Sequence, residues 1–361
     1  MTSPADSLPA YTEADFRSPP DGPCDLILEG GIASGVVHPY VVLELARKHR
    51  LNAIGATSAG ANAGVLAAAA EYARTARGDP GGFLRMKTIC DARAKALGEL
   101  FQESPGFEPV MALFKGRGGF PSRALKAFRA PLLLGAAAGF LVTGVLAFAG
   151  GTAPPPGAFG PDDPIPVLMG LARFAVALGG ALLGALVALA LAASRIGLKL
   201  NTRLGICTGL TTRPDRPPAI TDWLHRSIQD IAFGAAGPPP GKVLTFGDLE
   251  ANPRRKLQLR LIVSNLSQQR PHTLPDTWPK GRYRPSDWAR IFPTEILRHL
   301  EACTVNLGGG ARSLPDWRDL PILVASRMSM SVPGLFERVP VELEDVETPR
   351  RVAEMAAVGV E

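Results

Sequence analysis

Ser58 has the sequence surroundings of a nucleophile held on a tight turn. The apolar segment Leu51–Thr57 predicts a buried strand that ends at this serine, and an Ala-rich stretch that predicts a helix follows it. In a nucleophile elbow the chain turns sharply from strand to helix, so the serine needs small neighbours and its hydroxyl projects from the sheet edge. Ala56, Ala59 and Gly60 are small, although a strict G-x-S-x-G pattern would need glycine at position 56. Ser58 is therefore a candidate nucleophile for acyl transfer, and a simple helix N-cap is the alternative.

A glycine-rich turn precedes this serine. Asp25–Glu29 predicts a strand that ends at Gly30, Gly31 and Ile32. Backbone N–H groups of such a turn can stabilise the oxyanion of an acyl-transfer transition state. A dinucleotide site would need glycine in place of Ile32, and a phosphate-binding P-loop would need lysine in place of Val36. The order strand, turn, helix, strand predicts a right-handed crossover and a parallel α/β sheet.

Two long apolar segments in the middle of the chain, Pro131–Ala153 and Phe174–Ser194, contain no charged residue. At about 1.5 Å per helical residue, each is long enough to cross the ~30 Å core of a bilayer. Each segment also contains a pair of small residues that would let two helices approach closely: Gly135 and Gly139, Gly180 and Gly184. The sequence therefore predicts a transmembrane hairpin, and the alternative is a pair of helices buried in a large soluble core.

The outer flanks of this predicted hairpin are basic, whereas the loop between its segments is not. The basic flanking residues are Lys115, Arg117, Arg123, Lys126, Arg129, Arg195, Lys199 and Arg203. Because Lys and Arg in short loops favour the cytoplasmic side, we expect both ends of the hairpin and the rest of the protein to be cytoplasmic. The net charge of +6 fits either nucleic acid or anionic lipid. We expect membrane lipid and no nucleic acid as the partner.

Several stretches resemble the patatin-like phospholipase family. LEGGIASGVVHPYVVLELA followed by IGATSAGANAGVLAA is similar to the family's oxyanion turn and elbow, and LNTRLGICTGLT, ITDWLHRSIQDIA, LTFGDLE, LRLIVSNLSQQRPHTLP and ILVASRMSMSVPGLFERVPV are similar to segments of bacterial members. The family's A-S-x-x-x-P-x-x-F stretch is matched, with extra residues between, by Ala325, Ser326, Pro333 and Phe336. The resemblance implies a three-layer α/β/α fold with a mainly parallel sheet, interrupted here by the inserted hairpin, in a protein of the bacterial inner (cytoplasmic) membrane.

The resemblance also implies a mechanism: a serine/aspartate dyad that hydrolyses fatty acyl esters of membrane phospholipids, without a cofactor or a metal. By position Ser58 is the nucleophile, Ala56 and Gly60 belong to the elbow, and the oxyanion hole is formed by the backbone N–H groups of Gly30, Gly31, Ile32 and Ala59. The family usually has glycine in place of Ile32 and arginine or lysine in place of Ser34. A backbone N–H group survives either change, so we expect altered acyl-chain access and preserved chemistry.

The family's base is an aspartate in a D-G-G or D-G-A turn after the A-S-x-x-x-P-x-x-F stretch, and no such turn occurs before Glu361. Asp21 precedes a glycine but lies in the N-terminal tail, and Asp345 is followed by Val346. We therefore expect the catalytic aspartate beyond Glu361, and an inactive or poor hydrolase in the chain as given.

Three alternatives remain open at this point. One is a Ser-His-Asp triad that recruits a later histidine and a later aspartate, from His225, His272 and His299 and from Asp222, Asp248 and Asp276. Another is a membrane-tethered pseudoenzyme or scaffold. The third is an acyltransferase that uses the same serine.

The resulting domain plan has four parts. Residues 1–23 form a disordered tail, 24–120 the first part of the catalytic domain, 121–200 the inserted hairpin, and 201–361 the second part of the catalytic domain, incomplete at its C-terminus. The scattered cysteines predict free thiols in a reducing compartment and no metal site: Cys24, Cys90, Cys207 and Cys303. The sequence does not indicate an oligomeric state.

Overall fold

The computed structural model describes residues 11–31, 34–94, 97–115, 119–150, 158–160, 163–213, 215–252 and 256–343. The chain forms two compact units: one combines Met1–Gln102 with Cys207–Glu361, and the other is Glu103–Ile206. The second unit contains the expected hairpin but starts well before position 121, because two short helices, α5 (Glu108–Lys115) and α6 (Phe120–Ala127), group with it.

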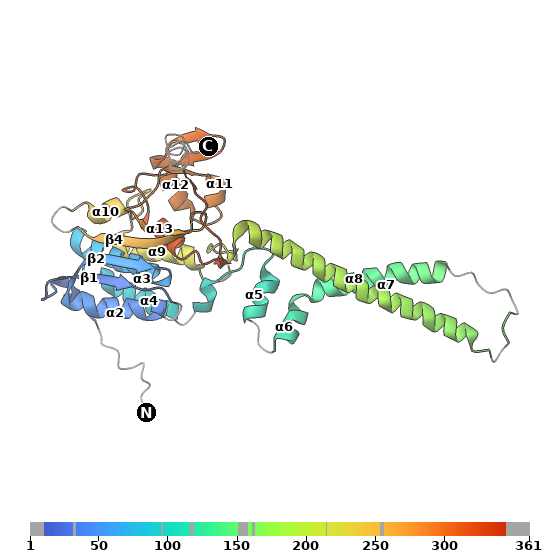
Figure 1. The fold of residues 1–361 in the computed structure, drawn as a ribbon. Helices are drawn as coiled ribbons and strands as arrows, with labels where there is room; N and C mark the ends of the chain where they lie inside the picture. The colour runs from blue at the N-terminus through green and yellow to red at the C-terminus, as the bar shows by residue number, and fades with distance from the viewer. Residues whose placement is uncertain are drawn as a thin grey trace, which may run out of the picture. The chain divides into compact units, whose positions relative to one another are not determined.

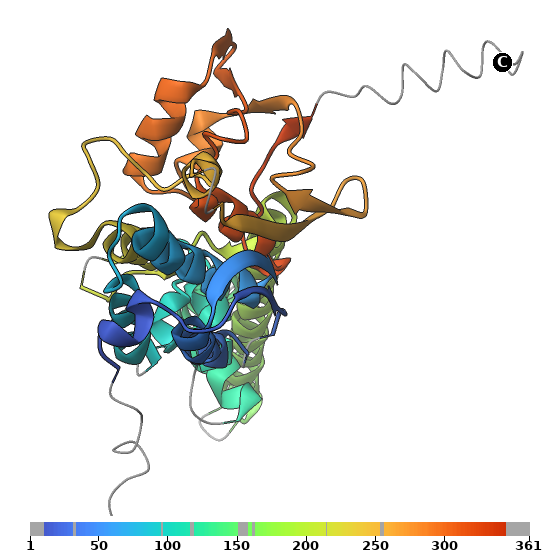
Figure 2. The same cartoon turned by 90° about the vertical axis from the view of Figure 1, so that its left-hand side faces the viewer.

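The first unit is built on a four-stranded sheet in the order β1 (Pro23–Leu28), β2 (Arg50–Thr57), β4 (Gln258–Asn265) and β5 (Arg270–Leu274) (Figure 1). The first three strands run parallel, and β5 returns antiparallel to β4. Although β2 and β4 are far apart in the sequence, they are neighbours in the sheet, as Figure 2 shows. The predicted mixed α/β fold with a mainly parallel sheet is therefore confirmed.

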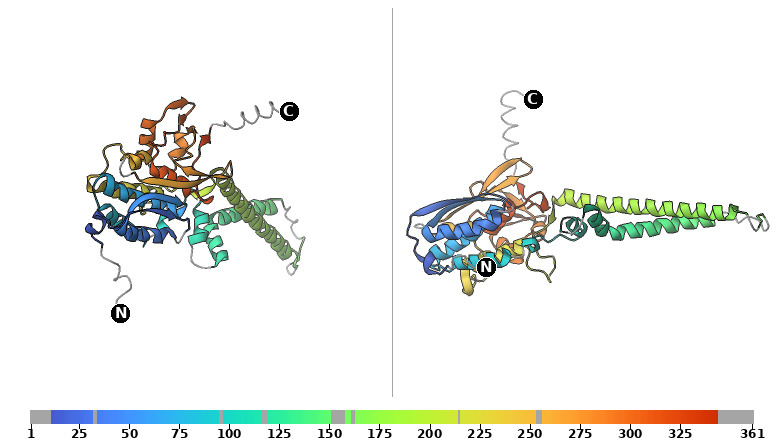
Figure 3. Two further views of the ribbon diagram at one scale, coloured as in Figure 1. Left: turned by 60° about the vertical axis from the view of Figure 1, so that its left-hand side comes forward. Right: turned by 90° about the horizontal axis from the view of Figure 1, so that it is seen from below.

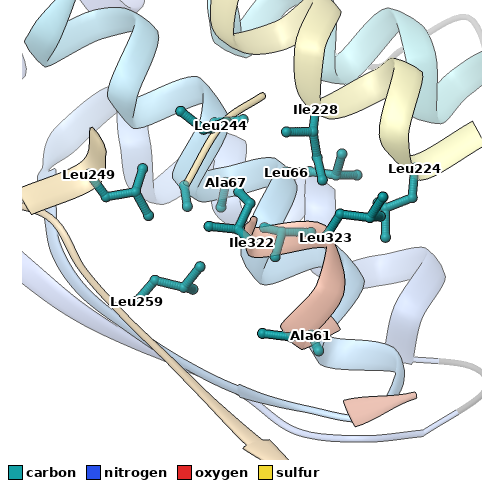
Figure 4. Close-up of a cluster of buried hydrophobic side chains, with 14 of the residues drawn as sticks. Ala61, Leu66, Ala67, Leu224, Ile228, Leu244, Leu249, Leu259, Ile322 and Leu323 are labelled. Carbon is teal, nitrogen blue, oxygen red and sulfur yellow. The ribbon is translucent and has the colours of Figure 1, made fainter. Parts of the chain in front are cut away.

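Alternate residues of the parallel strands face a layer of helices. These inward-facing side chains are all nearly inaccessible to solvent: Leu26, Leu28, Ile54, Ala56, Leu259 and Leu261. Helices α3 (Ala59–Ala76) and α13 (Ile322–Ser329) cover them, and Figure 4 shows Leu259, Ala67 and Ile322 pointing into one apolar cluster. On the opposite face Ile27 is 82% exposed and Ile262 is 44% exposed. Within the described residues, the second helical layer of a three-layer fold does not cover that face.

This unit also contains further helices and two smaller sheets. The helices are α1 (Ala14–Arg17), α2 (Ser34–Lys48), α4 (Gly82–Ala94), η2 (Leu97–Leu100), α9 (Ile220–Phe233), η3 (Gly234–Ala236), α10 (Phe246–Glu250), α11 (Pro285–Trp288) and α12 (Thr294–Cys303). A second sheet has the order β10 (Glu342–Leu343), β6 (Gly281–Tyr283), β8 (Ala311–Ser313) and β7 (Asn306–Gly308), all antiparallel, and β3 (Gly205–Cys207) pairs with β9 (Gly334–Phe336).

Part of the tail that we expected to be disordered is ordered. Residues 1–10 lie outside the described part of the chain, but α1 follows them, and its Phe16 is fully buried and stacks on Phe83 with ring centroids 5.1 Å apart. The buried Arg74 side chain donates a hydrogen bond to the Phe16 carbonyl oxygen at 3.3 Å and also pairs with Glu71. The prediction was wrong here because two aromatic side chains, Tyr11 and Phe16, pack against the core and anchor a segment whose overall composition is polar.

The second unit contains two long helices, α7 (Arg129–Ala149) and α8 (Ile165–Arg203), which lie side by side in Figure 3. Their glycines meet as expected. A Cβ atom added to Gly139 would lie 2.0 Å from the Gly180 carbonyl oxygen, and one added to Gly135 would lie 2.3 Å from the Gly184 carbonyl oxygen. Any larger residue at these positions would separate the helices, so the small-residue pairs set the close approach.

Both long helices are apolar and exposed. They have the length and composition to cross a membrane. Only 6% of the most apolar 18-residue stretch of α7 is buried, and only 11% of the corresponding stretch of α8. Large side chains such as Leu134, 72% exposed, and Leu146, 67% exposed, face outward. The alternative of two helices buried in a soluble core is therefore wrong, because a core helix would be covered on most of its surface. Helix α8 has 39 residues, so it extends beyond the expected span 174–194 at both ends.

Candidate active site around Ser58

Ser58 stands at the turn between β2 and α3 with an unusual backbone conformation, φ 53° and ψ −125°. Few non-glycine residues adopt a positive φ, and such conformations cost about 1–3 kcal/mol and concentrate at functional sites. Its side chain makes no capping hydrogen bond to the helix that follows. Ser58 therefore occupies the N-cap position of α3 without capping it through its side chain, and the geometry is that of a strained strand-to-helix elbow.

Small residues allow α3 to start this close to the sheet. A Cβ atom on Gly60 would lie 2.4 Å from the Leu28 carbonyl oxygen and 2.6 Å from the Glu29 carbonyl oxygen. One turn later, a Cβ atom on Gly64 would lie 3.0 Å from the Cβ atom of Ala56. Position 60 therefore requires glycine, and the small side chain of Ala56 leaves room for the helix next to β2.

The glycine turn after β1 lies directly against the elbow. A Cβ atom on Gly30 would be 2.8 Å from the Ser58 Cβ atom and 3.5 Å from its Oγ atom. The Gly35 N–H donates to the Gly31 carbonyl oxygen at 3.2 Å, which closes the turn into the start of α2. The structure thus brings Gly30 and Ser58 together. Ile32, a further candidate for the oxyanion hole, lies outside the described residues.

Helix α13 holds the elbow from the other side through a serine that sequence reasoning missed. The Ser58 N–H donates to Ser329 Oγ at 2.9 Å, and Ser329 Oγ donates to the Ile262 carbonyl oxygen at 2.6 Å. One turn earlier, Ser326 Oγ donates to Asn62 Oδ1 of α3 at 3.0 Å. Ser329 lies in the same segment as Ser326, which matches the A-S-x-x-x-P-x-x-F stretch. The motif therefore indicated this segment but not which of its serines contacts Ser58.

The neighbouring Arg327 is a structural residue. It is fully buried, and its guanidinium donates to the carbonyl oxygens of Thr208 and Glu337, both at 2.9 Å, and to Ser331 Oγ at 2.7 Å. Burial lowers its pKa to about 10, against the opposing effect of the Glu337 carboxylate. The group stays protonated near neutral pH and fixes the end of α13 to the segments around β3 and β9.

Two cavities meet at Ser58. The smaller, of about 260 Å³, has mostly apolar walls, which include Val36, Leu66, Ile220, Trp223, Leu335 and Phe336. The larger, of about 630 Å³, is lined by several polar side chains, which include Ser264, His272, Arg284, Asp287, Arg338 and Glu342. Ser58 therefore lies between an apolar compartment and one with mixed polar and apolar walls, an arrangement that suits an amphipathic ester.

Polar side chains in the smaller cavity are engaged by the protein. Tyr40 donates to Asp91 Oδ1 at 2.7 Å, and burial together with this carboxylate raises the pKa of Tyr40 to about 12. Arg93 donates to the Pro218 carbonyl oxygen at 2.5 Å and lies over the Trp223 ring at 5.9 Å. These partners bind the Tyr40 hydroxyl and one Arg93 nitrogen, and most of the surface of this cavity is apolar.

Three groups in the larger cavity could accept a proton. His272 is one of them, and its Nε2 atom is 3.2 Å from Gln268 Oε1. Asp287 is another, and nothing in the sequence distinguished it from other surface aspartates. Glu342, the third, forms ion pairs with Arg282 at 2.6 Å and Arg284 at 2.9 Å, and these hydrogen bonds lower its pKa.

The other predicted acid–base residues lie elsewhere. His225 is buried on α9, where desolvation lowers its pKa, and His299 Nε2 lies 2.9 Å from the Asp319 carbonyl oxygen. Neither histidine lines a cavity with Ser58. The candidate aspartates have structural partners: Asp222 accepts from Thr211, Asp248 from Lys242 and Thr245, and Asp276 from Arg260. Asp345 lies outside the described residues. Of the triad alternatives, only His272 shares a cavity with Ser58.

The cysteines and acidic residues do not form a metal centre in the described part of the chain. No group of three or more His, Cys, Asp or Glu side chains among these residues is arranged to hold a metal ion. All four cysteines are free thiols, with Cys90 and Cys207 buried and Cys24 and Cys303 half-buried.

The chain is similar in sequence to a curated bacterial protein. The chain is 33% identical over 357 residues to the RpoH suppressor of Rhizobium meliloti (strain 1021), an alignment that includes 88% of this chain and 52% of that protein. The chain therefore spans about half the length of this relative. No protein-family model matches the chain. No solved structure matches it either.

Proposed function

We propose that this chain carries the active site of a lipid acyl hydrolase of the patatin-like type, with Ser58 as the nucleophile. The observation that carries the proposal is the backbone of Ser58, at φ 53° and ψ −125°, on the turn from β2 to α3 and at the meeting point of two cavities. A purely structural serine would have no need of this strain, which is commonly stored where it serves a reaction. The resemblance also implies a three-layer fold; the mainly parallel sheet with one helix-covered face fits two of these layers, and the exposed face of the sheet lacks the third within the described residues.

In the proposed reaction Ser58 Oγ attacks the carbonyl carbon of a fatty acyl ester and loses its proton to a base. The oxyanion receives hydrogen bonds from backbone N–H groups of Gly30, Gly31 and Ala59, with Ile32 a further donor by the family resemblance. The C–O bond to the alcohol then breaks, the alcohol leaves with a proton, and water hydrolyses the acyl-enzyme. The contact of Gly30 with Ser58 supports this role, because only a residue without a side chain lets the turn come so close.

The two cavities suit the two halves of such an ester. The smaller one fits the acyl chain, since its walls are mostly apolar and the Tyr40 hydroxyl and one Arg93 nitrogen already have hydrogen-bond partners. The larger one fits the alcohol part, since His272 and Asp287 line it together with basic residues. Burial of apolar chain surface contributes roughly 0.8 kcal/mol per CH₂ group, so the acyl compartment would supply much of the binding free energy.

The D-G-G or D-G-A aspartate that the resemblance implies does not occur in this chain, so we expect the chain by itself to be a poor hydrolase, and we propose that its residual base comes from the larger cavity. Asp287 and His272 are the candidates, because Glu342 is already ion-paired with two arginines. Asp287→Asn or His272→Ala should then lower the rate by about 10²- to 10⁴-fold, the usual effect of losing a general base. If neither substitution changes the rate, the proton acceptor is not in this cavity.

The hairpin is proposed to cross the bacterial inner membrane twice, with both of its outer ends and the Ser58 unit in the cytoplasm. The exposed apolar surface of α7 and α8 supports insertion, and the basic flanks support this orientation. A reporter inserted at Gly160 should lie outside the cytoplasm, and one fused to the N-terminus should lie inside. A cytoplasmic signal from the Gly160 fusion would contradict the orientation.

The hydrolase proposal is tested with the full chain in detergent or proteoliposomes. A fluorophosphonate should label the protein, and Ser58→Ala should abolish labelling together with hydrolysis of p-nitrophenyl butyrate. The matched control is Ser286→Ala, since Ser286 is exposed, lines neither cavity and should not affect either readout. Absence of labelling in the folded wild type would favour a pseudoenzyme, and labelling with acyl transfer to an added alcohol in preference to water would favour an acyltransferase.

A further inference from the structure

Helix α6 is a short amphipathic helix immediately before α7. Its residues Phe120 and Ala124 recur at a four-residue interval, which places them on one side of the helix, next to Leu125. The opposite side is polar and carries Ser122, Arg123 and Lys126. A helix with a clean division between apolar and basic faces is typical of segments that bind a membrane surface.

The apolar side of α6 is exposed among the described residues. Phe120 is 63% exposed and Leu125 is 65% exposed, and no residue of the helix is buried. Together with Ala124 they leave one side of the helix apolar and in contact with water, which makes that side a candidate interaction surface. The contacts of α6 with α5 and α7 leave these two side chains outside.

The register of the hairpin fixes the level of α6 along it. Gly135 faces Gly184 and Ala188, whereas Gly139 faces Gly180, so α7 and α8 are antiparallel. The N-terminal end of α7, at Arg129, therefore lies at the same end of the hairpin as the C-terminal part of α8, which carries Arg195. Basic residues at the ends of apolar helices mark the headgroup level.

Only Phe128 separates α6 from α7, and Figure 1 shows α6 turning away from the direction of α7. If α7 crosses the bilayer, α6 is placed at the boundary between headgroups and acyl chains, where its apolar side can enter the lipid. Its cations and those at the hairpin's end match the negative surface of a leaflet that contains anionic lipid.

We infer that α6 is an interfacial helix that lies in the surface of an anionic leaflet, with Phe120 and Leu125 immersed among the acyl chains and Lys126 among the headgroups. The chemistry that recognises the partner is an apolar face bordered by cations, and the partner is a lipid surface. This contact goes beyond the two spans, because it would fix the depth and tilt of the segment that enters the membrane. It does not depend on the activity of Ser58.

The test measures the depth of nitroxide spin labels on the full chain in vesicles of phosphatidylcholine with or without phosphatidylglycerol. Labels are attached to Phe120→Cys, Leu125→Cys or Ser122→Cys in a background in which the accessible cysteines are replaced, Cys24→Ser and Cys303→Ser. Ser122 is the matched control on the polar side of the same helix. A label on Leu141→Cys, on the exposed surface of α7, reports insertion of the hairpin itself.

The expected result is that the labels at 120 and 125 collide with oxygen and are protected several-fold from a water-soluble nickel complex, whereas the label at 122 is open to nickel. Protection should increase with phosphatidylglycerol. Equal nickel access at 120, 122 and 125, with the Leu141→Cys label in lipid, would overturn the inference and leave the hairpin intact. If the labels at 120 and 125 are protected from oxygen as well as from the nickel complex, the interfacial helix is wrong and a protein, either another partner or a second copy of this chain, covers this side of α6. A Leu141→Cys label in water would overturn both insertion and the interfacial helix, and equal protection in both vesicle types would overturn the preference for anionic lipid.

Discussion

The strain at Ser58 predicts that removing the nucleophile can stabilise the protein. Its φ of 53° is accessible to glycine at little cost, whereas any residue with a Cβ atom pays about 1–3 kcal/mol there. Ser58→Ala keeps this strain, and Ser58→Gly removes it. Glycine loses about 0.5–1 kcal/mol more conformational entropy on folding than alanine. Subtracting this loss leaves Ser58→Gly more stable than Ser58→Ala by up to about 2.5 kcal/mol.

A matched pair of variants on α4 separates strain from the ordinary effect of glycine. Thr88 is exposed in the middle of that helix, where glycine should be less stable than alanine by about 1 kcal/mol. The alanine variant should therefore be the more stable one at position 88, and the glycine variant the more stable one at position 58. The stability difference between glycine and alanine at position 58, minus the same difference at position 88, equals the strain of about 1–3 kcal/mol.

Thermal unfolding of the full chain in detergent measures this, since 1 kcal/mol shifts Tm by about 2–4 °C in a domain of this size class. Hydrolysis of p-nitrophenyl butyrate is measured in parallel and should be lost in both Ser58 variants. If Ser58→Gly is destabilised relative to Ser58→Ala by the same margin as at Thr88, the elbow stores no strain and the structural case for the nucleophile fails.

Three further predictions concern the same unit. Gly60→Ala should lower the free energy of unfolding by about 3 kcal/mol and reduce fluorophosphonate labelling, because its Cβ atom would meet the Leu28 carbonyl oxygen at 2.4 Å; normal Tm and labelling would contradict this. His272→Ala should slow hydrolysis, whereas His299→Ala should not, because only His272 shares a cavity with Ser58; equal rates would remove His272 from the mechanism. Burial lowers the pKa of His225, so the unfolded chain binds its proton more readily and stability should fall as pH decreases through the ordinary histidine pKa; His225→Gln should weaken this pH dependence of Tm, and an unchanged profile would contradict it.

Much of the candidate site could be predicted from local sequence because its requirements are local. Ser58 between an apolar strand and an Ala-rich helix already predicts the elbow, and Gly60 is needed by the turn itself. The apolar composition of α7 and α8, with glycines at four-residue intervals, likewise predicts the close helix pair, since periodicity is a property of one segment at a time.

Contacts between distant segments could not be predicted in the same way. The support of Ser58 by Ser329, the presence of Asp287 and His272 in one cavity with Ser58, and the anchoring of the tail by Phe16 each join residues from separate parts of the chain. Serine and aspartate are common on protein surfaces, and their type alone does not indicate a partner.

The sequence by itself therefore determined the elbow, the glycine turn and the helix pair, because backbone geometry and apolar periodicity depend on neighbouring residues. Only the tertiary structure decided which groups surround the Ser58 hydroxyl and which face of the sheet is covered. The physical reason is that a polar side chain acquires its environment from packing, since burial, hydrogen bonding and nearby charge depend on segments that the fold brings together.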